Sequence, residues 1–392
     1  MKRMLWVFLM MSCGATFISS LFPLYSEYYH LSSLQITILF AIYAVFLLPT
    51  LLIVGVKGSE WGLKKVLRYS IWISIVSTII FIISFDFWSL FTARVLEGIA
   101  YGAFTGTAIP FLIVQSPANK ISTAIKLSGV TVLIGFGLGP AISGVVVEYL
   151  YSQSLSVPYW FLLVMLSSSL VILETFPVHN ESSIEKPIHT KISISIPSHI
   201  RSHFWSFVGL PIFIVFTLQG IAFSLLPSFA KNIIHTSNLS VSGLLILLLL
   251  GGASLSQFVP WPINIVTRIR FGISLFAIGS WAIILSGQFS NLILLWIGIF
   301  LQAIGGGWTF QVTFRLASQL PKPEERQGVI SVFYLCAYTG FIVPIIGFGV
   351  LTKFFSMTYS LILLNLFAAI FIVYILMYSI KFKQYYSNHY SY

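Results

Sequence analysis

Residues 89–113 read SLFTARVLEGIAYGAFTGTAIPFLI, and this is the most informative stretch of the chain. The run is almost entirely apolar or small, and it is long enough to cross the ~30 Å hydrocarbon core of a bilayer, which takes about 20 helical residues. In lipid a helix satisfies its own backbone hydrogen bonds, so an apolar run of this length predicts a membrane-spanning helix. This helix would carry two charges, Arg94 and Glu97, at membrane depth.

Similar apolar runs recur along the whole chain. Of its 392 residues, 57% are hydrophobic and only 8% are charged, and the mean hydropathy is +0.96. Soluble proteins are roughly 25% charged, so this composition excludes a soluble globular domain. We predict an all-α membrane protein with about twelve transmembrane helices, at residues 4–26, 34–55, 66–85, 89–113, 123–147, 158–177, 204–229, 240–259, 271–288, 291–314, 328–352 and 357–380.

The two halves of the chain repeat one another at a nearly constant offset of 204 to 206 residues. The matching pairs are Gly14 and Gly220, Pro23 and Pro227, His30 and His235, Leu96-Glu97 and Leu301-Gln302, and Pro140 and Pro344. A duplicated six-helix unit is an architecture that transporters use for alternating access. We therefore expect two pseudo-symmetric six-helix bundles, residues 1–177 and residues 204–392 with a short tail, joined by a cytoplasmic linker at 178–203.

Basic residues gather in alternate connections between the spans. If the N-terminus is cytoplasmic, all but three of the 21 Lys and Arg residues fall on the cytoplasmic side. The exceptions are Lys231 and Lys353, in outside loops, and Arg94 within a span. This asymmetry follows the positive-inside rule and predicts that both termini are cytoplasmic. We expect the protein to be integral to the plasma membrane. The net charge of +11 is then a topology signal, and no nucleic-acid partner is expected.

The polar residues of 89–113 share one helix face. At about 100° per residue, Arg94, Glu97, Tyr101 and Thr105 lie within about 80° of one another. A charge at membrane depth costs at least a few kcal/mol and needs a partner or a water-filled cavity. Burial disfavours the charged form of Glu97 whereas Arg94 favours it, so a conformational change would alter its proton occupancy. The residues of this face either hold neighbouring helices together or form a site of substrate or proton coupling.

Three other spans carry candidate functional residues. In the first span, Thr16 and Ser20 belong to a hydroxyl stripe that either faces a cavity or bonds a neighbouring helix. In the tenth span, Gln302 and Thr309 repeat this arrangement beside Trp308. The fifth span reads GFGLGPAISG from residue 135 to 144 and predicts a kinked helix that packs closely on a neighbour. Its candidate structural residues are Gly135, Gly139, Pro140 and Gly144.

Three local motifs resemble the major facilitator superfamily. The stretch GVKGSEWGLKK at 55–65 is similar to that family's cytoplasmic loop signature, with Gly55, Gly62, Lys64 and Lys65 as matches. Ser59 stands where Asp is usual and Glu60 where Arg is usual, so Glu60 is a candidate for the missing carboxylate. Residues 94–98 resemble the fourth-helix signature with Glu97 in place of Gln, and residues 135–144 resemble the fifth-helix signature, with Ser143 in place of a Gly.

The resemblance implies a central cavity lined by the first, fourth, seventh and tenth spans. In that family the fifth-span motif marks proton-coupled antiporters, mostly exporters of drugs. We expect secondary active transport of a small organic molecule by alternating access, with proton-coupled efflux as the first choice and nutrient uptake by symport or uniport as the alternative. The expected partners are the substrate and the lipid bilayer, with a monomer as the functional form and no cofactor beyond a proton gradient.

An enzyme is the less favoured class. The sequence has no intramembrane cluster of His, Asp and Glu at metal-ligand spacing, no Gly-x-Ser-x-Gly nucleophile motif and no nucleotide-binding P-loop. A channel is also disfavoured, because the duplicated, glycine-rich bundle lacks a ring of like charges. We therefore expect neither an enzyme nor a metal site.

Overall fold

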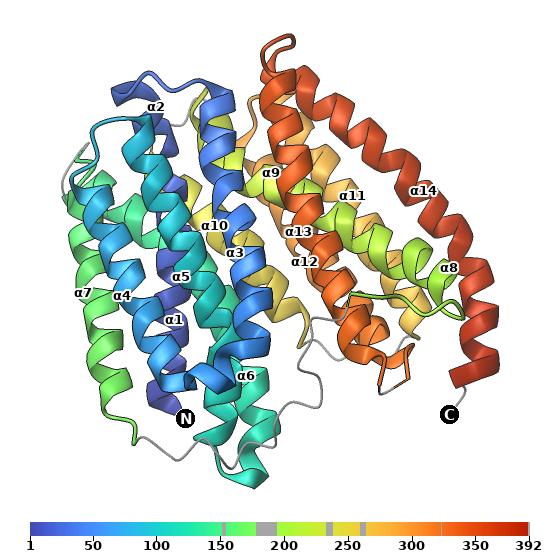
Figure 1. The fold of residues 1–392 in the computed structure, drawn as a ribbon. Coiled ribbons are helices and arrows are strands. Elements are labelled where there is room, and N and C mark those ends of the chain that lie inside the picture. Colours follow the sequence, from blue (N-terminus) through green and yellow to red (C-terminus); the bar gives the residue numbers. More distant parts are fainter. Residues whose placement is uncertain (151–153, 178–193, 233–237, 259–263, 323, 391–392) are drawn as a thin grey trace. The chain divides into compact units, whose positions relative to one another are not determined.

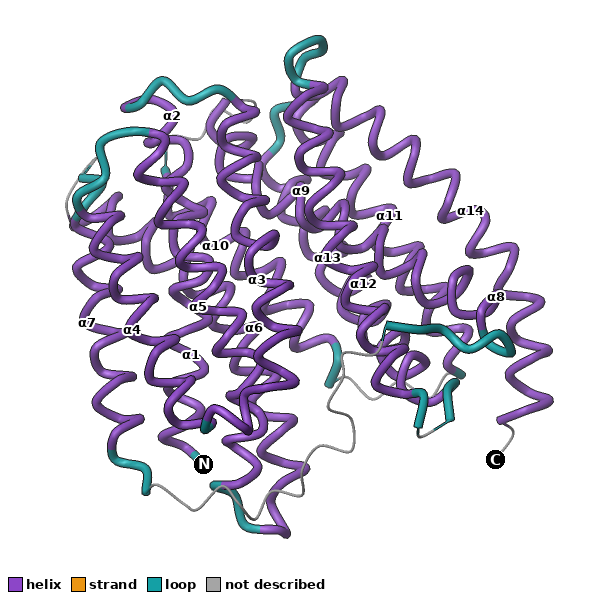
Figure 2. The backbone as a smooth tube through the Cα atoms, viewed as in Figure 1, coloured by secondary structure: helices purple, strands orange, loops and turns teal. Residues whose placement is uncertain are grey.

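The computed structural model describes the chain except residues 151–153, 178–193, 233–237, 259–263, 323 and 391–392 (Figure 1). The described residues form helices joined by short connections, with no strand among them (Figure 2). Twelve of the described helical stretches are long and apolar enough to cross a membrane. The predicted all-α fold of about twelve spans is confirmed.

The helices of the first half form six of these stretches. They are α1 (Lys2–Thr16), α2 (Phe22–Tyr28), α3 (Ser33–Trp61), α4 (Leu63–Ile82), α5 (Phe87–Val114), α6 (Ile121–Val145) and α7 (Val157–Glu174). A short 3-10 turn, Phe17–Leu21, joins α1 and α2 into one span. α3 runs beyond its predicted end and stops at Gly62, whose φ of 90° favours glycine and turns the chain directly into α4.

The second half follows the same plan. Its helices are α8 (Arg201–Phe204), α9 (Leu210–Asn232), α10 (Leu239–Ser256), α11 (Ile265–Gln288), α12 (Leu292–Gln319), α13 (Arg326–Leu351) and α14 (Met357–Tyr390). A π-helical turn, Trp205–Gly209, joins α8 and α9 into one span that begins three residues before its predicted start. α14 continues ten residues past the predicted end. The prediction followed the apolar run, whereas the helical backbone extends beyond it.

Packing groups the chain into two compact units. Unit 1 comprises Met1–Ile192, Leu226–Lys231 and Thr236–Gly251, and unit 2 comprises Ser193–Leu225, Asn232–His235 and Gly252–Tyr392. The end of α9 and most of α10 therefore pack with unit 1, although the sequence assigned them to the second bundle. Of the predicted linker, residues 178–193 lie outside the described residues. Its last part packs into unit 2, where Ile200 is fully buried in the core with Phe204 and Phe207.

The duplication is visible in how glycines pack within each unit. A Cβ added to Gly135 of α6 would lie 2.8 Å from the carbonyl oxygen of Leu9, and one on Gly340 of α13 would lie 2.4 Å from that of Phe213. The two glycines are 205 residues apart and their partners 204. Each half thus uses a glycine at a similar place, one residue off the register set by Pro140 and Pro344, to bring its first and fifth spans into backbone contact.

One ion pair joins matching positions of the repeat. Lys231, in the last turn of α9, forms an ion pair with Glu27 of α2. The two positions are 204 residues apart, the same offset as between Pro23 and Pro227. Close by in unit 1, the Glu148 carboxylate accepts a hydrogen bond from the backbone N–H of Leu239, at 3.0 Å, and caps the start of α10.

Candidate functional site

A buried ion pair lies in the first half of α5. Arg94 Nη1 is 2.5 Å from Glu97 Oε2, three residues further along the helix. Arg94 is 2% exposed and Glu97 4%. The structure therefore brings together the two charges that the sequence singled out. It encloses them within unit 1, to which their partners among the described residues also belong.

The Arg94 guanidinium also reaches two neighbouring helices. Its Nε donates to the carbonyl oxygen of Leu39 on α3 at 3.0 Å, and Nη1 donates to that of Ala15 on α1 at 3.4 Å. Its Cζ lies 4.5 Å from the centre of the Tyr43 ring, a cation–π contact. Arg94 therefore connects α1, α3 and α5, and its environment depends on how these three helices sit against one another.

Tyr101 and Thr105 continue the polar face of α5. Tyr101 is buried, and its hydroxyl lies 3.0 Å from Ser12 Oγ of α1. The Thr105 hydroxyl donates to the backbone carbonyl of Tyr101 at 2.8 Å, one turn back on its own helix. Tyr101 thus extends the α1–α5 contact that Arg94 begins, whereas the Thr105 hydroxyl is occupied within α5.

Thr16 and Ser20 bond to α6 instead of to one another. Pro140 has no N–H, so the carbonyl of Phe136, four residues earlier, loses its helical partner. The Thr16 hydroxyl donates to this carbonyl at 2.9 Å. Ser20 donates to the carbonyl of Pro140 at 2.7 Å. Of the two functions predicted for this stripe, the geometry favours hydrogen bonding between helices, and a cavity-lining role for these two residues stays a prediction.

The glycines of α6 make close contacts on two sides. A Cβ at Gly139 would lie 2.3 Å from the carbonyl oxygen of Cys13, and one at Gly144 would lie 2.7 Å from that of Leu239. Backbone atoms cannot give way as a flexible side chain can. Together with the Gly135 contact, this makes α6 a helix whose approach to α1 and α10 depends on missing side chains.

The loop between α3 and α4 leads into a charged cluster at the end of α7. Lys64 is buried, and its Nζ donates to the carbonyls of Phe176 at 2.6 Å and Glu174 at 3.3 Å. Arg68 makes a two-point contact with the Glu174 carboxylate, at 2.5 and 2.8 Å. The carboxylate beside Lys64 is thus Glu174, an acid that the sequence motif did not point to.

Three other residues of the 55–65 motif are exposed. Glu60 is exposed in the last turn of α3 and forms no ion pair with another described residue. Lys65 and Gly55 are also exposed, and a Cβ at Gly55 would meet nothing within 4 Å. The role predicted for Glu60 as a substitute carboxylate stays a prediction.

Gln302 and Thr309 lie on α12, in unit 2. Gln302 is fully buried, and neither its amide oxygen nor its amide nitrogen has a hydrogen-bond partner among the described residues. Thr309 is also buried, but its hydroxyl donates to the carbonyl of Gly305 on the same helix at 2.8 Å. One turn beyond Gln302, Gly306 faces Gln219 of α9. Of the two tenth-span residues predicted from the sequence, Gln302 therefore has unused hydrogen-bonding capacity and Thr309 does not.

Sequence reasoning missed Tyr43 and the Arg68–Glu174 pair. Tyr43 is one of many aromatic residues in the spans, and nothing in its position marks it as a partner of a charge 51 residues away. Glu174 did carry a signal in the sequence. It is an acidic residue near one end of its predicted span, and the opposite end of that span has no acidic residue. Among the described residues, no group of three or more His, Cys, Asp or Glu side chains is placed to hold a metal ion.

The comparisons with known proteins agree with this architecture. The model of the Major Facilitator Superfamily matches residues 4–293. A bacterial homolog of the human lysosomal transporter Spinster, solved in an inward-facing and occupied conformation, has a TM-score of 0.70 at 15% identity, with 96% of each chain covered. The nucleoside transporter NupG has a TM-score of 0.75 at 11% identity, covering 96% of this chain and 98% of that one.

A third structure, the human organic anion transporter MFSD10 (TETRAN), has a TM-score of 0.66 at 15% identity, with 95% of this chain and 99% of that chain covered. At such identities these likenesses concern the fold. That fold is one of helical membrane transporters. The chain belongs to the Major Facilitator Superfamily.

Proposed function

We propose that this protein is a secondary transporter that exports a small organic molecule by alternating access, in exchange for protons. The observation that carries the proposal is the buried Arg94–Glu97 pair. Glu97 is the only acidic side chain among the described residues that is buried. Ionisable groups enclosed in membrane helices are costly, and they mark substrate or proton pathways.

The depth of Glu97 suits a coupling carboxylate. It lies ten residues after the start of α5 at Phe87, which is about 15 Å along the helix axis at 1.5 Å per residue. That is about half of the ~30 Å hydrocarbon core. Transporters with internal repeats place substrate and coupling-ion sites near this midplane.

The contacts of Arg94 supply a way to change the proton occupancy of Glu97. Arg94 and Glu97 share one helix, but the remaining partners of Arg94 come from α1 and α3. If α1 or α3 shifts against α5, the guanidinium loses or gains acceptors and its hold on the carboxylate changes. Solvent entry in the same movement would change the cost of the charge. Both effects couple protonation to conformation.

The exchange of a substrate for protons is favoured by the α6 motif, whose close contacts with α1 and α10 suit a helix that limits leakage. Uptake by symport or uniport is the alternative, and the fold likeness to a nucleoside transporter keeps it open. The family and the fold speak against an enzyme.

We further propose a plasma-membrane monomer with both termini cytoplasmic. Cysteine labelling at Lys383 from each side, with Cys13 and Cys336 replaced, tests that orientation.

Transport into proteoliposomes, with and without an imposed pH gradient, tests the proposal. A panel of amphipathic dyes, nucleosides and organic anions identifies a substrate, and inverted vesicles give its direction. In Glu97→Gln we expect substrate to bind and equilibrate, while accumulation driven by the pH gradient is lost. Gln is the usual residue of the family here, so the variant should fold. If Glu97→Gln keeps the same dependence on the pH gradient, Glu97 is not the coupling carboxylate.

A further inference from the structure

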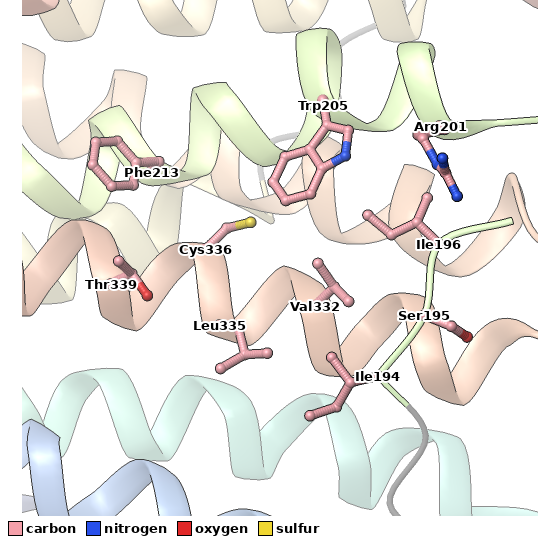
Figure 3. A pocket seen from close by; sticks show the side chains of 10 residues that line it. All are labelled: Ile194, Ser195, Ile196, Arg201, Trp205, Phe213, Val332, Leu335, Cys336 and Thr339. Carbon is pink, nitrogen blue, oxygen red and sulfur yellow. The ribbon is translucent and has the colours of Figure 1, made fainter. Parts of the chain in front are cut away.

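A groove of about 610 Å³ lies in unit 2, between the α8–α9 span and α13 (Figure 3). On α13 its lining residues follow a helical spacing of three and four, so one face of that helix forms a wall. The segment 194–196, at the end of the predicted linker, closes the groove next to Arg201. The lining residues are Ile194, Ser195, Ile196, Arg201, Trp205, Phe213, Val332, Leu335, Cys336 and Thr339.

The groove follows from the local backbone of the α8–α9 span. The π-helical turn Trp205–Gly209 widens the helix, and such turns are frequent at functional sites. Gly209, at the end of this turn, lies beside two of the lining residues. A Cβ there would lie 3.2 Å from the Trp205 ring and 3.4 Å from Cys336 Sγ. A larger residue at 209 would fill the space between these two side chains.

The lining is apolar along the groove and cationic at one end. Trp205, Phe213 and Leu335 present hydrocarbon surface, whereas the Arg201 guanidinium lies at the end nearest the linker segment. Arg201 is exposed and forms no ion pair with another described residue. An amphipathic molecule with an anionic head complements this arrangement.

The length and level of the groove match one leaflet of a bilayer. Arg201 is the first residue of its membrane span, and Trp205, 49% exposed, lies one turn further in. Arg and Trp are typical of the headgroup level. From Arg201 to Phe213 the helix rises about 18 Å, close to half of the ~30 Å hydrocarbon core. A groove of this length can hold an acyl chain whose headgroup lies at the level of Arg201.

We propose that this groove binds an anionic phospholipid, with its phosphate on Arg201 and an acyl chain between α9 and α13. Anionic lipids are concentrated in the cytoplasmic leaflet, where basic pockets between membrane helices bind their headgroups. The cytoplasmic position of Arg201 rests on the topology proposed above. The lipid is a separate ligand from the transported molecule, so this inference goes beyond the transport function.

The first test counts lipids bound to the purified full-length protein by native mass spectrometry, with phosphatidylglycerol and phosphatidylcholine as probes. Arg201→Gln should weaken phosphatidylglycerol binding about fivefold and leave phosphatidylcholine unchanged, since one basic residue near the membrane surface contributes about that factor. The matched control is Arg270→Gln, an exposed arginine in the first turns of α11 that does not line the groove. Equal losses in the two variants, or no preference for phosphatidylglycerol, would overturn the proposal.

The second test locates the lipid. Cys336 lines the groove, and in a Cys13→Ala background it is the only thiol. Phosphatidylglycerol should slow its reaction with N-ethylmaleimide, and Arg201→Gln should remove this protection. Glycerol 3-phosphate, which has the headgroup charge without a chain, should give none. Protection by glycerol 3-phosphate equal to that by phosphatidylglycerol would mean a site for soluble anions instead, and lipid-insensitive labelling would place the lipid elsewhere.

Discussion

Glu97 on α5 and Gln302 on α12 occupy matching positions of the two halves, 205 residues apart, and both are buried. Glu97 has Arg94 at 2.5 Å, whereas the position matching Arg94 in the second half is Ile299. Gln302 has no hydrogen-bond partner among the described residues, for either amide atom. The first half balances its polar site internally, and the second leaves a neutral amide unsatisfied.

From this difference we expect the two sites to have different roles. A buried polar group without a partner costs about 1–3 kcal/mol, so Gln302 gains most from a bound molecule that offers both a donor and an acceptor. A closed ion pair gains less from a ligand and responds more to the movement of its own helices. We therefore expect α5 to carry coupling and α12 to carry substrate contacts.

The largest effect is expected when residues of the second half are substituted at the matching positions of the first half. Arg94→Ile leaves Glu97 buried without its partner and should destabilise the protein by about 3–5 kcal/mol. Thermal unfolding of the purified protein measures this. Adding Glu97→Gln recreates the Ile–Gln combination of α12 and should recover most of the loss. A double variant as unstable as Arg94→Ile would show that Arg94 stabilises the fold through α1 and α3, independently of Glu97.

A second large effect is expected where the backbones of α1 and α6 are in close contact. Gly139→Leu drives a side chain into the backbone of Cys13 and should abolish transport while membrane insertion continues. The matching residue of the second half is Val343, which is exposed, so this constraint belongs to the first half alone. Gly129→Leu is the control on the same helix, since a Cβ there meets nothing within 4 Å. Normal transport by Gly139→Leu in proteoliposomes would show that this close contact does not control the conformational change of transport.

A smaller effect is expected at Gln302. Gln302→Leu removes an unsatisfied amide, so the thermal unfolding midpoint should stay the same or rise. If substrate bonds this amide, KM should increase about threefold to tenfold, the loss of one hydrogen bond. Gln311→Leu is the contrast, because Gln311 Nε2 donates to the carbonyl of Gln257 at 2.8 Å, and the variant should lower the midpoint. An unchanged KM in Gln302→Leu would remove α12 from the substrate site.

The smallest effect is expected at the Arg68–Glu174 pair, 40% and 43% exposed. Solvent screens such pairs, so Arg68→Gln should cost no more than about 1 kcal/mol in the free energy of unfolding. The matching residues of the second half are Ile273 and Ser379, which form no ion pair, so that half already folds without this contact. Lys64→Gln should cost more, because Lys64 is buried and bonds two carbonyls at the end of α7. A larger loss for Arg68→Gln than for Lys64→Gln would reverse this ranking.

The sequence predicts the helices well, because each span needs an apolar run of fixed length. It also predicts that Arg94 and Glu97 can pair, since three residues along a helix is a local relation. Contacts between helices are harder to foresee. That Pro140 frees the carbonyl of Phe136 follows from local geometry, but the donor that replaces the lost bond, Thr16, depends on which helix packs there. The Lys64–Glu174 contact joins residues 110 apart for the same reason.

The division into units departs from the expected boundary for a related reason. Composition marks where spans begin and end, whereas the side on which a helix packs depends on surfaces such as the α6 glycines. Gly144 and Gly137 accept the backbone of α10, so α10 joins unit 1 although the repeat assigns it to the second half. The π-helical turn at Trp205–Gly209 is likewise absent from any local propensity pattern.

The ion pair between Glu27 and Lys231 carries information about the history of the chain. At a gene duplication both copies hold the same residue at every matching position, so a position that touches its own counterpart begins as a contact of like with like. Two glutamates or two lysines there would repel. A pair of opposite charges requires that at least one of the two copies has changed. At this contact a difference between the two copies, and not their likeness, supplies the attraction.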